Sequence, residues 1–265
     1  MAEILTPRPA ATVLTLRDSL NGYEILMLRR NNRSEFMGGA YVFPGGGVDA
    51  SDANTDQLAF GLDDESASGR LGLDSGGLSY YVACLRELFE EAGLLIVCDE
   101  SGAQVTFSDP TDIKRMANLR RSVNAGEIDV HAILRDEGLW LDLRGIEYLA
   151  HWITPLGMPR RYDTRFFVAL APSGQVATHD AGETVADQWV RPRDALDAHA
   201  RGDFDLMFPT IRNLEAIADF SSAGEVLNYA RSLESIPCVV PQIRRRDDEI
   251  VIVTPGDEGF EVTDD

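Results

Sequence analysis

Residues 79–95 read SYYVACLRELFEEAGLL, and this stretch predicts one amphipathic helix that ends near its glycine. Apolar residues recur in it at helical spacing and would face a core: Val82, Leu85, Phe89 and Ala92. Gly93 stands where a helix C-cap is expected, because glycine adopts the left-handed conformation of that position without steric strain. The stretch therefore predicts a helix that is buried along one side.

A second face of the predicted helix carries three carboxylates. Glu87, Glu90 and Glu91 lie at i, i+3 and i+4, so their side chains project in the same direction. Their mutual repulsion would be relieved by Mg²⁺, Mn²⁺ or Ca²⁺, because hard divalent cations take oxygen ligands. Arg86 precedes Glu90 by four residues and can pair with it, which would fix the position of that carboxylate. The alternative is an ordinary solvated acidic face of a surface helix.

An apolar segment that enters a glycine-rich turn lies upstream, with the sequence YVFPGGGVD at 41–49. Together with the helix it resembles the signature of the Nudix hydrolases, G-x5-E-x7-R-E-U-x-E-E-x-G-U, where U is apolar. Gly46 corresponds to the first glycine, and residues 86–94 match the second half of the signature at every specified position.

The first half of the signature departs from the family pattern. Asp52 stands where the pattern has glutamate, and 33 residues separate it from Arg86 where the pattern has seven. The surplus at 53–78 is rich in Asp, Ser, Gly and Ala, so we expect a surface loop with a helical turn near 58–62. We leave Asp52 out of the expected metal ligands because its side chain is shorter than glutamate.

The interruption itself resembles one branch of the family, the peroxisomal coenzyme A diphosphatases, in which a long insertion splits the signature at the same place. The resemblance extends to residues 29–40, 152–155 and 160–167. It implies hydrolysis of coenzyme A or acyl-CoA to 3′,5′-ADP and (acyl-)4′-phosphopantetheine. Two alternatives stay open: a pyrophosphatase for ADP-ribose, NADH or dinucleotides, and a catalytically silent nucleotide-binding module.

The resemblance also implies a fold and a metal site. The fold is the α/β (α+β) Nudix fold, a mixed β-sheet sandwiched between helices. The implied ligands of Mg²⁺ or Mn²⁺ are Glu87, Glu90, Glu91 and a backbone carbonyl near Gly46, with Glu90 catalytic and Arg86 orienting it.

A polar loop at 179–185, with the sequence HDAGETV, offers a general base. In Nudix enzymes the corresponding loop often carries a glutamate that binds metal or acts as a base, and Glu183 is our candidate. The alternative is an ordinary loop carboxylate. His179 can also act as a base near neutral pH, but we rank it below Glu183.

Five arginines are candidates for binding the phosphates of the substrate: Arg30, Arg33, Arg160, Arg161 and Arg165. For the first two the alternative is a solvated loop. For the last three, which would read the 3′-phosphate of coenzyme A, the alternative is ion pairing with this protein's own carboxylates.

Composition limits the classes of partner. The formal charge of −20 over 265 residues disfavours binding to nucleic acid and docking on an anionic membrane. Three scattered cysteines without C-x-x-C spacing predict neither a disulfide framework nor a zinc site. The start has no signal-peptide pattern and the end, VTDD, is not the peroxisomal tripeptide, so we expect a cytoplasmic protein.

The chain is expected to be one domain over residues 1–265. A helical insertion at about 110–138, with helices at 112–124 and 126–137, would cap the site or form a homodimer contact. The acidic tail at 254–265 is expected to be poorly ordered. Further strands are predicted at 9–16, 23–29, 94–97, 148–154, 164–171, 188–190 and 250–253, and further helices at 192–201, 209–220 and 224–233.

Overall fold

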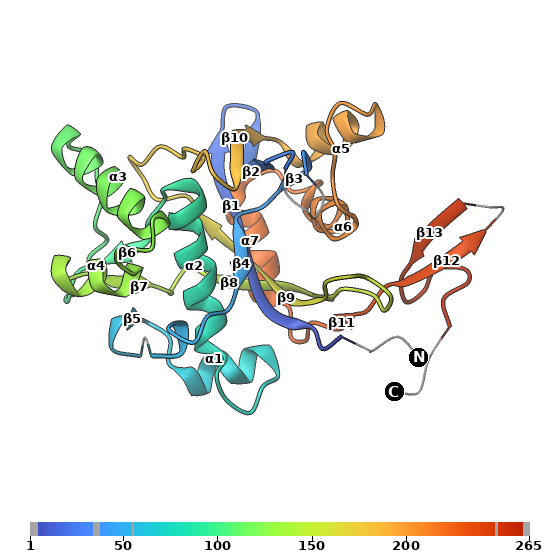
Figure 1. The fold of residues 1–265 in the computed structure, drawn as a ribbon, viewed down its shortest axis with the longest axis horizontal. Helices are drawn as coiled ribbons and strands as arrows, with labels where there is room; N and C mark the ends of the chain where they lie inside the picture. The colour runs from blue at the N-terminus through green and yellow to red at the C-terminus, as the bar shows by residue number, and fades with distance from the viewer. Residues whose placement is uncertain (1–4, 34–37, 55, 247–248, 262–265) are drawn as a thin grey trace.

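A mixed β-sheet forms the centre of the molecule (Figure 1). The structure, a computed structural model, describes residues 5–33, 38–54, 56–246 and 249–261. The strands of the main sheet are β1 (Arg8–Ser19), β2 (Gly22–Arg30), β3 (Tyr41–Val42), β4 (Gly45–Gly47), β8 (Glu147–Ile153), β9 (Tyr162–Leu170), β10 (Thr184–Val190) and β11 (Cys238–Val239). They follow the order β10-β2-β1-β9-β8-β11, with β3 beside β2 and β4 beside β1. β1 pairs with β9 in parallel, as β8 does with β11, and the other pairs are antiparallel.

The predicted hairpin at the start of the chain is confirmed. β1 and β2 pair in antiparallel register through a tight turn in which Ser19 faces Gly22. Side chains of β1 alternate between two cores, as expected for a strand that is buried on both faces. Ala11 and Val13 face one core, whereas Leu14 and Leu16 face the other.

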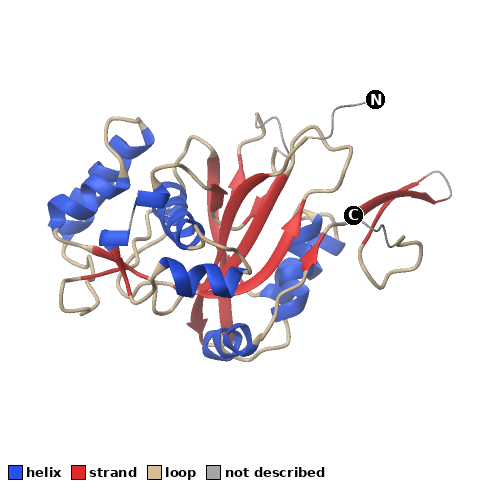
Figure 2. Ribbon diagram, turned by 90° about the horizontal axis from the view of Figure 1, so that it is seen from below, coloured by secondary structure: helices blue, strands red, loops and turns tan. Residues whose placement is uncertain are grey.

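Helices cover both faces of this sheet, so the predicted sandwich is confirmed (Figure 2). One face is covered by α2 (Leu78–Ala92), which packs on β1, β4 and β9. The other is covered by α5 (Pro192–Ala200), α6 (Phe208–Ile217) and α7 (Ala223–Ser232), close to their predicted positions. No helix among the described residues is long and apolar enough to cross a membrane.

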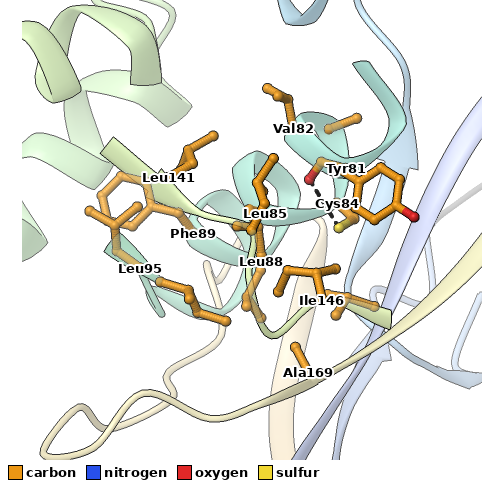
Figure 3. Packing of buried hydrophobic residues seen from close by; sticks show 14 of the residues in the cluster. Tyr81, Val82, Cys84, Leu85, Leu88, Phe89, Leu95, Leu141, Ile146 and Ala169 are labelled. Atoms are coloured by element: carbon orange, nitrogen blue, oxygen red, sulfur yellow. Dashed lines mark hydrogen bonds between the residues drawn. The ribbon is translucent and has the colours of Figure 1, made fainter. Parts of the chain in front are cut away.

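Helix α2 matches the prediction in detail. Its predicted core residues are all buried: Val82, Leu85, Phe89 and Ala92. Gly93 forms the C-cap with a φ of 70°, and its N–H donates to the carbonyl of Phe89. Figure 3 shows Leu85, Phe89 and Leu95 in the cluster that joins α2 to the small sheet described below. The helix is therefore held by its apolar face.

The insertion at 53–78 is not the simple loop that we expected. It contains a 3-10 turn at Asp56–Leu58, just before the expected helical turn at 58–62, then the short strand β5 (Ala59–Phe60) and α1 (Asp64–Leu71). The signals for α1 are present in the sequence: Asp63 accepts a bond from Ser66 N at the N-cap, and Gly72 ends the helix in the left-handed conformation. Asp64 then accepts from Leu78 N at 3.0 Å, so the insertion caps α2.

The two insertions form one structural unit. Strand β5 joins β7 (Trp140–Asp142) and β6 (Val97–Cys98) in a separate three-stranded sheet. Beside it lie α3 (Pro110–Asn124) and α4 (Val130–Glu137), near the predicted helical pair (Figure 1). Trp140 Nε1 donates to the carbonyl of Gln57 at 3.0 Å and ties the later segment to the earlier one.

The C-terminal region adds a hairpin that the sequence analysis predicted only in its second strand. β12 (Gln242–Arg246) pairs with β13 (Glu249–Val253) outside the main sheet. The poor order expected for the tail stays a prediction, and residues 254–261 make local contacts. Asp257 accepts from Thr254 in a turn, and Glu261 returns to Gln242 through two hydrogen bonds. The remaining tail residues lie outside the described part of the chain.

Candidate active site

Strand β4 approaches both helix α2 and strand β1 closely through its glycines. A Cβ added to Gly46 would lie 2.3 Å from Glu87 Oε1, and one added to Gly45 would lie 2.5 Å from the carbonyl oxygen of Ala11. Gly45 N donates to Glu91 Oε2 at 3.0 Å. The glycine-rich segment of the signature therefore brings backbone into direct contact with two of the three predicted metal ligands.

Arg86 is the centre of the site, and its main partner is Asp52. The guanidinium binds this carboxylate with both oxygens, through Nε to Oδ1 at 2.9 Å and Nη2 to Oδ2 at 3.1 Å. The side chain of Arg86 is 8% exposed and that of Asp52 is 0% exposed. The pair is thus a buried bidentate contact, the strongest geometry for these two groups.

The remaining donors of Arg86 bind the glycine strand and two of the predicted metal ligands. Nη2 donates to the carbonyl of Gly47 at 2.8 Å, and Nη1 donates to Glu87 Oε1 at 3.0 Å and Glu90 Oε2 at 3.1 Å. The structure therefore shows the contact with Glu90 that the i, i+4 spacing predicts. The sequence analysis missed the role of Asp52, although its position in the signature was a signal for it.

The carboxylates of α2 lie in surroundings that favour their protonated forms. Burial raises the pKa of Glu87 to about 7, against the attraction of Arg86. Burial also raises the pKa of Glu90, and it raises that of Glu91 well above the ordinary value, with repulsion from Glu87 adding to the effect. Carboxylates of this kind would become more acidic if a positive charge were added beside them.

In the arrangement seen, Glu87 and Glu90 turn to Arg86 while Glu91 turns to Gly45. Among the residues that the structure describes, no group of three or more His, Cys, Asp or Glu side chains is gathered closely enough to hold a metal ion. The chemistry of the donors nevertheless fits a hard divalent cation, since all three are carboxylates and two of them contact β4. Sharing one ion would require these side chains to turn from their present partners.

Glu183 and Arg30 lie on neighbouring segments that face the carboxylates. Glu183 raises the pKa of both Glu87 and Glu91, whereas Arg30 lowers that of Glu91, so both charges act on the site. The carbonyl of Glu183 accepts from Asn31 N at 2.9 Å, which joins the loop to the end of β2. Arg30 Nε is buried without a hydrogen-bond partner among the described residues, so it has a donor for a ligand.

The other two loop candidates, His179 and Arg33, have local partners. His179 Nδ1 is paired with Asp187 Oδ1 at 2.7 Å, which ties its ring to β10. Arg33 is exposed, and its N–H donates to Asn31 Oδ1 at 3.1 Å. The structure thus brings Glu183 to the carboxylates, leaves Arg33 exposed, and uses His179 in a local hydrogen bond with Asp187.

The three later arginines do not form one cluster. Arg160 is exposed, whereas Arg161 donates to the carbonyls of Thr154 and Leu5 at 3.0 and 2.8 Å. Arg165 is 4% exposed, pairs with Asp163 and lies 4.5 Å from the ring centre of Tyr80. Tyr80 is eleven residues before Glu91 on α2, about 16 Å along the helix axis. Arg165 therefore lies beside the opposite end of α2 from the carboxylates.

Beside Arg165, the contact between His151 and Asp163 depends on pH. His151 Nε2 lies 2.6 Å from Asp163 Oδ1 and 3.8 Å from Cys238 Sγ. Burial alone would lower the pKa of His151, but the bonds to Asp163 and Cys238 outweigh it and raise the pKa to about 9. The pKa of His151 in the folded protein lies above its ordinary value of 6.5. The contact with Asp163 therefore stabilises the fold fully below pH 6.5, and this stabilisation is lost as the pH rises through about 9.

We therefore expect His151→Gln to lower the melting temperature clearly at pH 6 and by much less at pH 10. Thermal unfolding of both proteins across this range measures the difference. Asp163→Asn also removes the carboxylate that buried Arg165 binds at 2.9 Å, so it should lower the melting temperature at both pH 6 and pH 10. A gap between His151→Gln and the unaltered protein that stays constant from pH 6 to pH 10 would contradict this account.

Comparison with known proteins agrees with the geometry. Residues 64–217 match the family model described as the NUDT19 Nudix domain. The acyl-coenzyme A diphosphatase NUDT19 of Xenopus laevis is 26% identical to this chain, and the match covers 91% of this chain and 72% of the relative. The protein of the same name from Homo sapiens is 25% identical, with 89% and 72% covered.

A solved structure supports the same assignment. The crystal structure of a NUDIX hydrolase from Alicyclobacillus acidocaldarius superposes with a TM-score of 0.69 at 29% identity, covering 84% of this chain and 96% of that chain. The family model begins at the first residue of α1, so most of the insertion lies within the matched pattern. Since the model matches more than half of the sequence, this chain belongs to the NUDT19 Nudix family and is a Nudix pyrophosphohydrolase.

Proposed function

We propose that this chain cleaves the pyrophosphate bond of coenzyme A or acyl-CoA, giving 3′,5′-ADP and (acyl-)4′-phosphopantetheine, with Mg²⁺ or Mn²⁺ as cofactor. The observation that carries the hydrolytic part is the buried Arg86–Asp52 pair, which places Glu87 and Glu90 against the glycine strand. The names of the curated relatives, which are acyl-coenzyme A diphosphatases, support the substrate.

The residues that would hold the divalent cation are Glu87, Glu90 and Glu91, with a backbone carbonyl near Gly46. When bound, a divalent cation supplies positive charge beside the phosphate oxygens and makes water more acidic. The raised pKa values of Glu87 and Glu91 mean that loading the site releases protons from these carboxyls, so affinity for the cation should rise with pH.

The protein's other residues have separate tasks in this proposal. Arg86 orients Glu87 and Glu90, and Asp52 holds Arg86 in place. Arg30 offers its unpaired Nε–H to a phosphate oxygen of the substrate. Glu183 accepts the proton of the attacking water, because its loop brings it within electrostatic range of Glu87 and Glu91.

Recognition of the 3′-phosphate is the finer part of the proposal. Of the three later arginines, exposed Arg160 and half-buried Arg161 are the better candidates, since Arg165 is buried against Tyr80. Coenzyme A carries the 3′-phosphate, which 3′-dephospho-coenzyme A and ADP-ribose lack. A site whose guanidinium groups bind the 3′-phosphate would discriminate against 3′-dephospho-coenzyme A and ADP-ribose.

A substrate panel with product identification tests the proposal. Coenzyme A, decanoyl-CoA, 3′-dephospho-coenzyme A, NADH and ADP-ribose are incubated with the protein and Mg²⁺ or Mn²⁺, with EDTA as the control. We expect 3′,5′-ADP from the first two, at a kcat/KM above that for the dephospho compound, and no product in EDTA. Equal cleavage of coenzyme A and its dephospho form, or exclusive cleavage of NADH or ADP-ribose, would overturn the substrate assignment. No turnover with any of the five would favour a silent nucleotide-binding module.

The sequence also predicts a cytoplasmic location and allows a homodimer. We retain both as proposals. Fractionation of the source cells checks the location, and the molar mass in solution by light scattering checks the assembly.

A further inference from the structure

A cavity of about 460 Å³ lies at the C-terminal end of α2, between α3 and residues 175–180. Its volume is within the usual range for small-molecule sites. Buried apolar side chains form much of its lining: Phe89, Leu95, Phe107 and Met116. Two exposed apolar side chains, Ile113 and Val176, also line it, at 48% and 80% exposure. The cavity can therefore accept an apolar group from solvent.

The cavity wall contains one buried cation with an unused donor. Arg120 is only 9% exposed and lines the cavity. Its Nε donates to the carbonyl of Glu90 at 2.9 Å and its Nη1 to that of Thr178 at 2.7 Å. Its Nη2 is buried and has no hydrogen-bond partner among the described residues. A buried donor of this kind ordinarily has an acceptor, so the position is suited to a ligand oxygen.

The charges around the cavity are mixed. Lys114 and Arg121 are cationic lining residues, and Asp180 is an anionic one. The oxygens of Asp180 accept bonds from Thr184 and from Glu183 N, so this carboxylate is engaged in its own loop. The lining therefore offers hydrogen-bond donors and apolar surface.

The cavity adjoins the catalytic residues through α3. Arg120 and Asn124 both donate to the carbonyl of Glu90, at 2.9 and 3.1 Å. On the other side, the lining residues His179 and Asp180 begin the loop that carries Glu183. The cavity therefore adjoins both the last turn of α2 and the start of the Glu183 loop.

We infer, on the basis of the proposed function, that this cavity binds the acyl end of an acyl-CoA, and that Arg120 Nη2 donates to the thioester carbonyl or to the nearest amide carbonyl of the pantetheine arm. That arm is uncharged, carries carbonyl acceptors and ends in an apolar chain. The apolar lining matches the apolar chain, and the buried, unpartnered Nη2 of Arg120 matches a carbonyl acceptor. The helical insertion then serves to select acylated substrates.

Blocking the cavity tests this inference. Ala117 lines the cavity from an exposed position on α3, so Ala117→Trp fills the space without disturbing the core. Thr111→Trp is the matched control, because Thr111 is exposed on the same helix and does not line the cavity. We expect Ala117→Trp to lower kcat/KM for decanoyl-CoA about tenfold or more and to leave that for coenzyme A within about twofold. Thr111→Trp should change neither value.

A binding measurement separates this inference from the proposed function. Decanoyl-pantetheine, which has no nucleotide, is titrated calorimetrically into the unaltered protein and both variants. Binding that Ala117→Trp abolishes and Thr111→Trp preserves supports the inference even if no coenzyme A compound is hydrolysed, in which case only the proposed function fails. The inference is overturned if the unaltered protein does not bind the probe, if Ala117→Trp binds it equally well, or if that variant slows coenzyme A and decanoyl-CoA to the same extent.

Discussion

Glu90→Gln is expected to lower turnover about 10²-fold or more while the protein stays folded, the scale of losing one preorganised charged group at a reaction centre. The substitution keeps the shape of the side chain and an oxygen that can accept the bond from Arg86 Nη1. It removes the negative charge. The side chain of Glu90 is also 25% exposed, the most of the carboxylates that contact Nη1, so its loss costs little packing.

Steady-state kinetics at saturating Mg²⁺, together with a thermal unfolding curve, measures this effect. Glu65→Gln on α1 is the control, since Glu65 is exposed and lies on another helix. We expect that variant to match the unaltered protein in both measurements. Turnover of Glu90→Gln near that of the unaltered protein would remove Glu90 from the catalytic residues.

The helix at the centre of the fold could be predicted from sequence because its determinants are local. Residues 79–95 contain the apolar spacing, the glycine that ends the helix and the carboxylates at i, i+3 and i+4. The contact between Arg86 and Glu90 lies within one turn, so helical geometry alone determines it. The hairpin of β1 and β2 was predictable for the same reason, because a tight turn sets its register.

Contacts between distant segments could not be predicted in this way. The small sheet combines β5 from the first insertion with β7, more than 80 residues later, and neither strand has enough length to show a periodic pattern. Arg165 is close to other arginines in sequence, but strand β9 aims it at Tyr80 rather than toward the catalytic carboxylates. Charge clusters in a sequence therefore show which groups are available, while the strand register decides where each one points.

The pair between Asp52 and Arg86 leads to the second large expected effect. Asp52→Asn should lower the free energy of unfolding by about 3 kcal/mol, since removing one partner leaves the other charge buried without full compensation. Arg86 keeps its bonds to Glu87, Glu90 and the Gly47 carbonyl, which limits the loss. Turnover should also fall, because the same guanidinium orients Glu87 and Glu90.

The chain contains a matched control for this substitution. Asp49 Oδ2 lies 3.7 Å from Arg86 Nη2, but its side chain is 67% exposed. Asp49→Asn removes the same charge from the same arginine and should change the free energy of unfolding by less than about 0.5 kcal/mol, because exposed ion pairs contribute little. Urea unfolding and kcat measured on both variants decide the matter. If the two variants lose equal stability, the net charge near Arg86, and not the buried contact, determines the stability of this site. If Asp52→Asn alone is destabilised and slow, the buried bidentate contact is what holds the catalytic carboxylates in place.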